Sequence, residues 1–179
     1  MFRKSSNCVS FVVPALNEEN IVQDVINDIW SQADALLNTF ELILINDGST
    51  DKTGHIMDQS SNELAHVRVF HNQTNKGLGE AYKKGLAEAQ FKYVMMLCGD
   101  GGLPASNLPH ILEKIGEADI IIPYMTNLKK IKSPFRYLIS RSYTGLLNLL
   151  FGYSIRYYNG LPLHKTKLVR ALNISSGGF

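Results

Sequence analysis

Cysteine and long apolar runs are both scarce in this sequence. Only Cys8 and Cys98 occur among the 179 residues, too few for a disulfide framework, so we interpret both as reduced thiols. No apolar stretch reaches the roughly 18 residues that a membrane-spanning helix needs, and the N-terminus has no signal-peptide apolar region. These absences favour a globular protein in the cytoplasm, with the inner face of the membrane as a second location.

Acidic residues are absent from the last third of the chain. All 16 Asp and Glu lie in residues 1–119, whereas residues 120–179 hold nine of the 18 Lys and Arg. This asymmetry predicts that the C-terminal third meets an anion, such as a phosphate or a lipid headgroup, although a solvated basic face is an equal alternative. Nucleic acid is not expected, because the aromatic residues of this third are more easily core than a base-stacking platform.

Five short apolar segments alternate with helical ones. Predicted strands cover residues 9–13, 40–45, 67–70, 93–97 and 119–122, and predicted helices cover residues 17–29, 51–64, 77–90 and 108–115. This alternation predicts a single α/β domain, a mainly parallel sheet flanked by helices on both faces. No G-x-G-x-x-G motif follows the first strand, so a dinucleotide-binding oxidoreductase is poorly supported.

Polar clusters follow three of the predicted strands. Residues 14–18 follow the first strand, residues 46–51 follow the second, and Asp100 follows the fourth. Ligands of open parallel sheets bind at the carboxyl ends of the strands. We therefore expect these clusters to form one site at one edge of the sheet.

An apolar, helix-like segment covers residues 137–155 and is interrupted by Arg141. Its leucines could pack in the core or lie in a membrane interface. Core packing is favoured, because 45% of the chain is apolar and needs burial, but both interpretations stay open.

Three motifs carry a resemblance to a known family. Residues 13–19 (VPALNEE), 45–51 (INDGSTD) and 75–81 (NKGLGEA) resemble, in order and spacing, the family-two glycosyltransferases of the GT-A fold. The nearest subgroup is the dolichyl- and polyprenyl-phosphate sugar transferases. The resemblance implies a Rossmann-like GT-A domain over 1–179 that ends before the family's usual domain end. Residues 1–125 would be the nucleotide-sugar-binding half, and 126–179 an incomplete basic segment on the acceptor side.

The same resemblance implies a donor site. Pro14 and Ala15 would line the base through the main chain, Glu18 would reach the ribose, Asp47 would accept a nucleobase N–H, and Gly77 would approach the diphosphate. On physical grounds alone, Asp47 could instead be a turn acid and Gly77 could serve helix–sheet packing. Position 16 lacks the family's aromatic residue, so base stacking is not expected there. Ser49 is expected to cap the following helix.

Residues 98–100 align with the family's D-x-D motif, which holds Mg²⁺ or Mn²⁺ against the diphosphate. Cys98 replaces the first acid, and Gly102 stands where the family often has Gln. A thiol is a poor ligand for a hard cation. Asp100 is therefore the expected catalytic and metal-binding residue, with diphosphate oxygens and water completing the coordination.

Arg136 and Arg141 resemble basic residues of the subgroup that face phosphates, and Arg136 is the expected catalytic one. Arg156 stands where the subgroup has an acid. A phosphate acceptor is already ionised and needs no carboxylate base, so the missing acids fit a polyprenyl phosphate; alternatively, the base lies in a part that this sequence does not contain. The expected reaction moves a sugar from a UDP- or GDP-linked donor to a lipid phosphate or a glycan, with peripheral membrane contact. The alternative is a nucleotide-binding domain without turnover.

Overall fold

A computed structural model of the chain describes residues 5–124, 126, 133–158 and 160–175. The chain forms two compact units. Residues 1–121 and 163–179 make up the first, here called the sheet unit. Residues 122–162 make up the second, here called the α6 unit. Each unit is described by itself.

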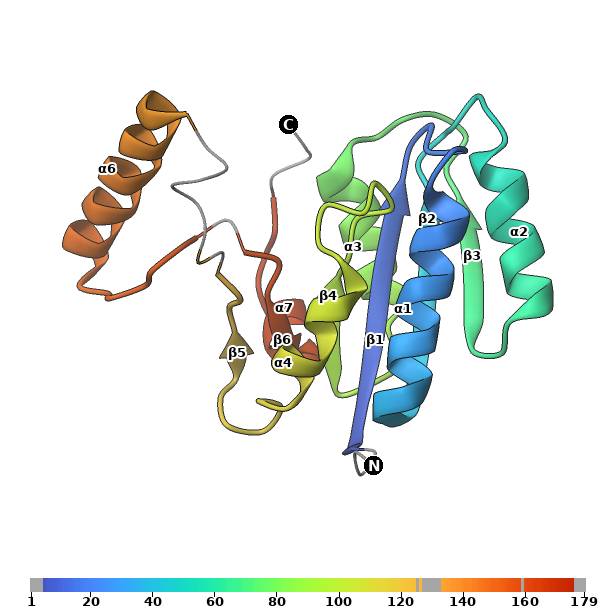
Figure 1. Ribbon diagram of the computed structural model, residues 1–179, viewed down its shortest axis with the longest axis horizontal. Coiled ribbons are helices and arrows are strands. Elements are labelled where there is room, and N and C mark those ends of the chain that lie inside the picture. Colours follow the sequence, from blue (N-terminus) through green and yellow to red (C-terminus); the bar gives the residue numbers. More distant parts are fainter. Residues whose placement is uncertain (1–4, 125, 127–132, 159, 176–179) are drawn as a thin grey trace. The chain divides into compact units, whose positions relative to one another are not determined.

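The sheet unit is built on six strands (Figure 1). Their order is β3-β2-β1-β4-β6-β5, and the first four are mutually parallel, whereas β6 is antiparallel to both β4 and β5. The strands are β1 (Ser5–Ala15), β2 (Leu37–Asn46), β3 (Val67–His71), β4 (Tyr93–Met96), β5 (Ile120–Ile121) and β6 (Leu163–Lys165). The strand order reverses direction between β1 and β4, which is where open α/β sheets hold ligands.

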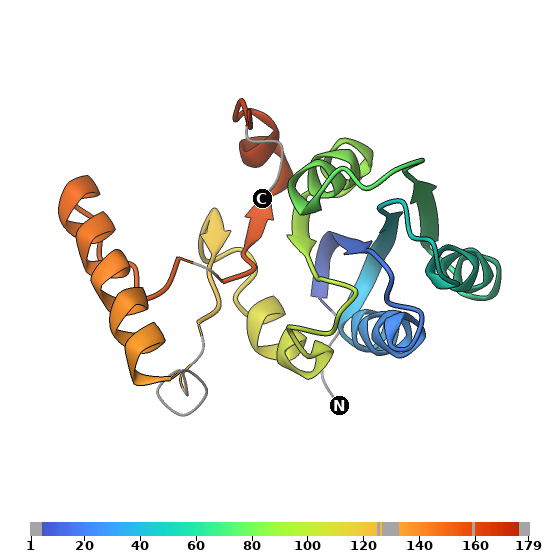
Figure 2. The same ribbon diagram turned by 90° about the horizontal axis from the view of Figure 1, so that it is seen from above.

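Helices cover both faces of this sheet (Figure 2). Helices α1 (Val22–Leu36), α2 (Thr53–Glu63) and α4 (Leu108–Leu112) lie on one face, and α4 follows the short 3₁₀ turn η1 (Ala105–Asn107). Helices α3 (Leu78–Glu88) and α7 (Thr166–Arg170) lie on the other. Right-handed crossovers explain this arrangement, because the chain moves outward from β1 to β3 and then returns past β1 to β4.

The core between α3 and the sheet shows why the apolar segments fold this way. Val12, Ile43 and Ile45 are fully buried against Ala81 of α3. Gly85 lets α3 approach closely, since a Cβ there would overlap the Val12 side chain. Fully burying a side chain of this size stabilises the fold by about 1.5–3 kcal/mol, so the α3 face is a main source of stability.

The five predicted strands and the mainly parallel sheet are confirmed. β1 runs past its predicted end through Pro14 to Ala15, and α4 ends at Leu112, earlier than predicted. The sixth strand was not predicted, because three residues of β6 carry no alternation that a pattern could detect. The segment after residue 162 therefore returns to the sheet instead of continuing the preceding unit.

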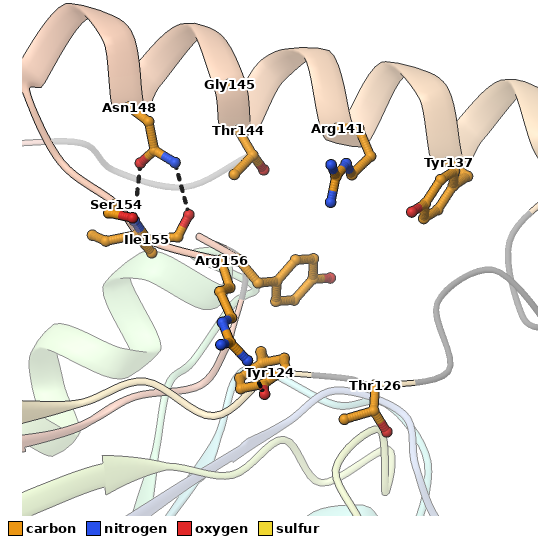
Figure 3. A pocket seen from close by; sticks show the side chains of 11 residues that line it. Tyr124, Thr126, Tyr137, Arg141, Thr144, Gly145, Asn148, Ser154, Ile155 and Arg156 are labelled. Carbon is orange, nitrogen blue, oxygen red and sulfur yellow. Dashed lines mark hydrogen bonds between the residues drawn. The ribbon is translucent and has the colours of Figure 1, made fainter.

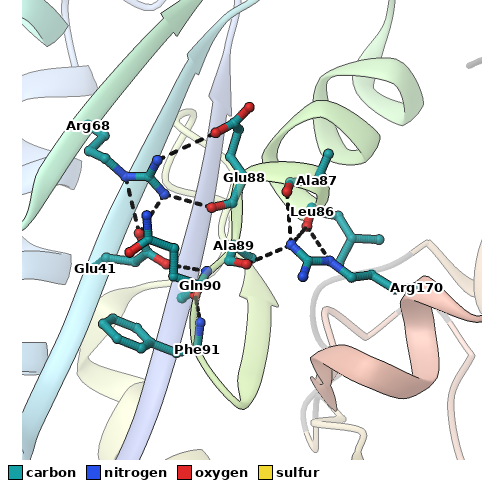
Figure 4. A network of polar contacts seen from close by, with 10 residues as sticks. Glu41, Arg68, Leu86, Ala87, Glu88, Ala89, Gln90, Phe91 and Arg170 are labelled. Atoms are coloured by element: carbon teal, nitrogen blue, oxygen red, sulfur yellow. Dashed lines mark hydrogen bonds and ion pairs between the residues drawn. The ribbon is translucent and has the colours of Figure 1, made fainter.

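Arg170 of α7 links the segment after residue 162 to α3 by hydrogen bonds (Figure 4). Its guanidinium donates to the carbonyl oxygens of Leu86, Ala87 and Ala89 at 2.6–3.0 Å. The last carbonyls of a helix have no partner within the helix, and a cation near them also interacts favourably with the helix dipole. Arg170 therefore caps the C-terminal end of α3.

The α6 unit contains one long helix, α6 (Pro134–Phe151). Pro134 occupies the first turn, where its missing N–H has no cost, and Gly152 ends the helix in a left-handed conformation with φ of 67°. None of the described α6 residues is buried, so this unit by itself provides no core for its leucines, and their expected core packing stays a prediction. Among the described residues, no helix has the length and apolarity needed to cross a bilayer.

Candidate functional site

The loops that follow β1 and β2 are joined by reciprocal hydrogen bonds. The Asn17 N–H donates to Ser49 Oγ over 3.0 Å, and the Thr50 N–H donates to Asn17 Oδ1 over 2.9 Å. Asn17 has a φ of 56°, a left-handed conformation that asparagine tolerates better than most residues. The Glu18 N–H also donates, to Thr53 Oγ1 over 2.8 Å. These bonds fix the β1 loop against the start of α2.

Asp51, and not Ser49, caps α2. Asp51 Oδ1 accepts the N–H of Thr53, the first residue of that helix, over 2.9 Å, and Oδ2 accepts the Glu19 N–H over 3.1 Å. Burial raises the pKa of Asp51, but the hydrogen bonds from Thr53 and Glu19 outweigh it, and the pKa lies below its ordinary value. The expectation for Ser49 is wrong, because its hydroxyl is taken up by the β1 loop.

Asp47 lies directly after β2 and is only 4% exposed. Its Oδ1 accepts hydrogen bonds from Asn72 Nδ2 at 2.7 Å and from the Lys76 N–H at 3.1 Å. Its Oδ2 accepts the Gly77 N–H at 2.9 Å. A carboxylate offers about four acceptor positions, so three bonds leave one for a ligand. Asp47 therefore fixes the β3–α3 loop and keeps the capacity to accept one more donor.

Two glycines let the β3–α3 loop take this course. Gly48 has a φ of 76°, and a Cβ there would collide with the main chain of Thr74 and Asn75. Gly77 has a φ of 88° and precedes α3. Its N–H donates to Asp47 and also to Asn75 Oδ1 at 2.8 Å. The Gly77 N–H is therefore used inside the loop, and a phosphate at this point would have to meet neighbouring groups.

The segment after β4 approaches the end of β1 closely. The Gly99 N–H donates to the Pro14 carbonyl oxygen over 2.9 Å, and a Cβ on Gly99 would lie 2.6 Å from Ala15 Cβ. This contact requires glycine. The next residue, Asp100, is exposed, and its Oδ1 accepts the Gly102 N–H over 2.9 Å. Gly102 thus orients the Asp100 carboxylate and leaves its Oδ2 open.

Cys98 is unsuited to replace the acid that the resemblance would place there. Burial, with a smaller contribution from the negative charge of Asp100, raises the pKa of the Cys98 thiol to about 11. The side chain is therefore a neutral thiol near pH 7. Among the described residues, no three His, Cys, Asp or Glu side chains form a group that could hold a metal ion. The donor set fits a divalent cation only through Asp100, with the remaining ligands supplied by a diphosphate and water.

These loops enclose a cleft of about 370 Å³ where the strand order reverses. Six residues that the sequence indicated line it together: Pro14, Ala15, Glu18, Asp47, Gly77 and Asp100. Cys98, Leu16, Asn75, Leu78 and Ala81 complete the lining. Clefts of this size at this position of an α/β sheet are typical sites for small ligands.

A second pocket, of about 620 Å³, lies within the α6 unit (Figure 3). Arg141 and Arg156 both line it, and the side chains from α6 point toward Tyr124 and Arg156. The Arg156 guanidinium donates to the Tyr124 hydroxyl over 2.5 Å and lies 5.1 Å from its ring centroid. Arg136 is exposed on α6 and does not line this pocket. The structure thus places Arg141 with Arg156 and apart from Arg136.

Sequence reasoning missed two functional candidates. Arg156 was treated only as a departure from a family pattern, although the absence of acids after residue 119 was a signal that any arginine there lacks a carboxylate partner nearby in sequence. Asn72 was not considered. It is 9% exposed, donates to Asp47, and accepts from Lys84 Nζ at 2.9 Å. No local pattern marks such a residue, because its partners come from two other elements.

The fold and the cleft define an α/β protein with a ligand site at the switch point of a parallel sheet. The family model for glycosyl transferase family 2 matches residues 10–170. The chain therefore belongs to glycosyl transferase family 2, and the resemblance seen in the motifs, with its GT-A fold, is confirmed.

Relatives and solved structures agree with this assignment. The chain is 31% identical over 106 residues to an uncharacterized glycosyltransferase, EpsJ, of Bacillus subtilis, covering 59% of this chain and 30% of that protein. It is 30% identical over 112 residues to the dolichyl-phosphate beta-glucosyltransferase ALG5D of Trichomonas vaginalis, covering 60% and 34%. The chain thus spans about a third of the length of these relatives.

Among solved structures, the glucosyl-3-phosphoglycerate synthase of Mycobacterium tuberculosis, in complex with Mn²⁺, UDP-glucose and phosphoglyceric acid, superposes with a TM-score of 0.69. The identity is 21%, and the match covers 93% of this chain and 59% of that one. At this identity the likeness establishes the fold alone.

Proposed function

We propose that the chain is the donor-binding part of a glycosyltransferase that moves a sugar from a nucleoside diphosphate to an acceptor. The observation that carries the proposal is the cleft at the switch point, which brings Asp47, Gly77 and Asp100 together from three separate loops. The names of the relatives in the family and the UDP-sugar bound by a structural neighbour support the same reading.

Within this proposal, Asp47 binds the nucleobase. It is buried, and it retains one acceptor position beside the three that the β3–α3 loop uses. Nucleobases present ring N–H donors, which match a carboxylate oxygen. Pro14, Ala15 and Glu18 line the same cleft, where Pro14 and Ala15 would contact the base and Glu18 the ribose.

Asp100 would hold a Mg²⁺ or Mn²⁺ ion against the diphosphate. Such an ion, when bound, offsets the charge that develops on the departing nucleoside diphosphate. The Asp100 carboxylate supplies one oxygen ligand, and the Gly102 N–H keeps the other carboxylate oxygen oriented. Because Cys98 adds no ligand, we expect metal affinity to depend on the diphosphate.

The acceptor that fits the α6 unit best is a lipid phosphate. Arg141 and Arg156 line one pocket, and no Asp or Glu occurs anywhere in residues 120–179. A phosphate oxygen would bond to the anomeric carbon of the sugar as the bond to the diphosphate breaks. No proton has to be removed from the acceptor, so no base is required. The pocket does not support the expected catalytic role of Arg136, since Arg136 does not line it.

Calorimetric titration with UDP and GDP, with and without Mn²⁺, tests the donor site. We expect one nucleotide to bind, and Mn²⁺ to strengthen binding in the native chain but not in Asp100→Ala. Asp28→Ala is the matched control, because Asp28 is an exposed acid on α1 outside the cleft. If Mn²⁺ strengthens nucleotide binding by Asp100→Ala as much as by the native chain, the metal assignment to Asp100 is wrong.

A nucleotide-binding protein without turnover is the second candidate. The lone carboxylate beside the neutral Cys98 thiol favours it. Nucleotide binding without hydrolysis or transfer of a bound sugar, measured with both UDP- and GDP-linked donors and a polyprenyl phosphate, would favour this candidate over the transferase.

A further inference from the structure

The bond between Asp47 and Asn72 leads away from the cleft to a cation on α3. Asn72 Nδ2 donates to Asp47 Oδ1 over 2.7 Å, and Asn72 Oδ1 accepts from Lys84 Nζ over 2.9 Å. Asp47 lines the cleft, whereas Asn72 and Lys84 do not. The three side chains therefore form a chain of hydrogen bonds that begins on α3 and ends at the cleft.

The two ends of the Asn72 amide cannot be exchanged. A lysine ammonium group only donates hydrogen bonds and an ionised carboxylate only accepts them, so the amide oxygen has to face Lys84 and the amide nitrogen Asp47. Asn72 is 9% exposed, and its main-chain N–H donates to the Asn46 carbonyl oxygen over 2.8 Å. The main chain of Asn72 is thus held, and its side chain has one orientation that satisfies both partners.

The Lys84 ammonium group is itself held in place at the end of β3. Nζ also donates to the His71 carbonyl oxygen over 2.9 Å and lies 5.9 Å from the centroid of the Phe70 ring. Within the part of the chain that the structure describes, Lys84 forms no ion pair. Its charge therefore acts on Asp47 through the Asn72 amide, and hydrogen bonds that involve a charged group are stronger than neutral ones.

We infer that Lys84 is a positioning residue of the donor site. It orients the Asn72 amide, and through that amide it fixes the Asp47 carboxylate for the ligand, without touching the nucleotide itself. When the ammonium group is removed, the nearly buried Asn72 oxygen loses its donor, and the amide turns toward water and away from Asp47. The inference rests on the proposed function for its ligand, but the orientation of Asn72 can be measured without one.

Nuclear magnetic resonance of the ¹⁵N-labelled full chain, recorded without nucleotide, tests this orientation. The Asn72 side-chain NH₂ signal is assigned by its absence in Asn72→Ala, and the Gly77 N–H reports on the carboxylate that accepts it. In Lys84→Met both signals should shift, and the Asn72 NH₂ protons should exchange faster with water. Lys83→Met is the matched control, because this adjacent lysine of α3 pairs with Glu80 instead, and it should leave both signals unchanged.

Calorimetric titration of the same samples with UDP tests the consequence for the ligand. We expect Lys84→Met to bind UDP about fivefold more weakly than the native chain, whereas Lys84→Arg, which keeps a donor, should stay within about twofold. Lys83→Met should bind like the native chain. Because Lys84 acts through Asn72, the double variant Lys84→Met/Asn72→Ala should bind UDP as Asn72→Ala does.

Three results would overturn the inference: native Asn72 and Gly77 signals in Lys84→Met, an equal change in Lys83→Met, or losses of UDP affinity that add in the double variant. A lysine that served the fold alone would lower the stability of Lys84→Met without moving either signal. If the native chain binds neither UDP nor GDP, the proposed donor site is wrong. The spectra, which need no nucleotide, then still decide whether Lys84 orients Asn72.

Discussion

Two buried carboxylates, one within β2 and one directly after it, are hydrogen-bonded in different ways. Glu41, 5% exposed, accepts four hydrogen bonds: from Ser10 Oγ and the Gln90 N–H on one oxygen, and from Arg68 Nε and Nη2 on the other (Figure 4). Asp47 accepts three, all from neutral donors. The first carboxylate is paired with a cation and has no free acceptor position. The second has no cation partner among these bonds and retains one free acceptor position beside the cleft.

This difference distinguishes a carboxylate whose acceptor positions are all used within the fold from one that retains a position for a ligand. A buried charge that is fully paired and hydrogen-bonded serves the fold, because no group remains to recognise a ligand. A buried charge held only by amides and main-chain N–H groups is fixed in position yet remains electrostatically available. Glu41 thus has no free acceptor position for a ligand, whereas Asp47 has one beside the cleft.

The largest expected effect comes from removing the cation that pairs with Glu41. Arg68→Ala leaves a buried carboxylate with two donors and should lower the free energy of unfolding by about 3 kcal/mol, near the low end for broken buried pairs because Arg68 is 33% exposed. Urea denaturation measures this, and UDP affinity should stay unchanged. Lys114→Ala, which breaks the exposed Lys114–Glu117 pair, should cost less than about 0.5 kcal/mol. Equal losses would mean that the Arg68 pair adds nothing to the fold.

Neutralising Asp47 should affect binding more than any change at Glu41. In Asp47→Asn an amide NH₂ faces donors, so UDP affinity should fall about tenfold or more and the free energy of unfolding by about 1–2 kcal/mol. Titration calorimetry with UDP provides the measurement. Glu41→Gln, a change of a buried acid within β2, is the matched control and should leave UDP affinity as it is. Native affinity in Asp47→Asn would remove Asp47 from the donor site.

Asn72 tests whether the loop positions Asp47. Asn72→Ala deletes one of the three bonds to that carboxylate, so we expect a loss of about 1 kcal/mol in stability and a several-fold weaker UDP affinity. Asn27→Ala, at an exposed position of α1, is the control. If Asn72→Ala loses stability but binds UDP like the native chain, its role is confined to the fold.

The smallest expected effect is a change in the reactivity of Cys98 when the negative charge of Asp100 is removed. With a pKa of about 11, Cys98 is mostly protonated at neutral pH, so its alkylation by iodoacetamide should keep accelerating as the pH rises toward 11, whereas an ordinary thiol levels off near pH 9. Burial and the charge of Asp100 both raise the pKa of Cys98, and burial contributes more. Asp100→Asn removes the smaller contribution and should speed alkylation of Cys98 at pH 8 by about threefold. Peptide mass spectrometry separates Cys98 from Cys8. An unchanged rate would show that burial alone raises the pKa.

Much of the sheet unit was predictable because its signals are local. The apolar segments predicted the strands, and the residues at or after the ends of β1, β2, β3 and β4 indicated six of the cleft residues, although their individual roles stay predictions. Which arginines line the pocket of the α6 unit was harder to predict from the sequence. Arg141 and Arg136 are five residues apart on one helix and therefore face different sides, so only one reaches the pocket. Arg156 reaches the same pocket from a segment beyond the helix.

The sequence by itself determined the α/β alternation, the acid-free last third of the chain, and the polar loops at one edge of the sheet, because each depends on residues close together in the chain. Only the tertiary structure decided that Glu41 meets a cation while Asp47 does not, and that β6 and Arg170 return to the sheet. Each of these depends on partners tens of residues away. The order of strands brings such partners together, and local periodicity does not encode that order.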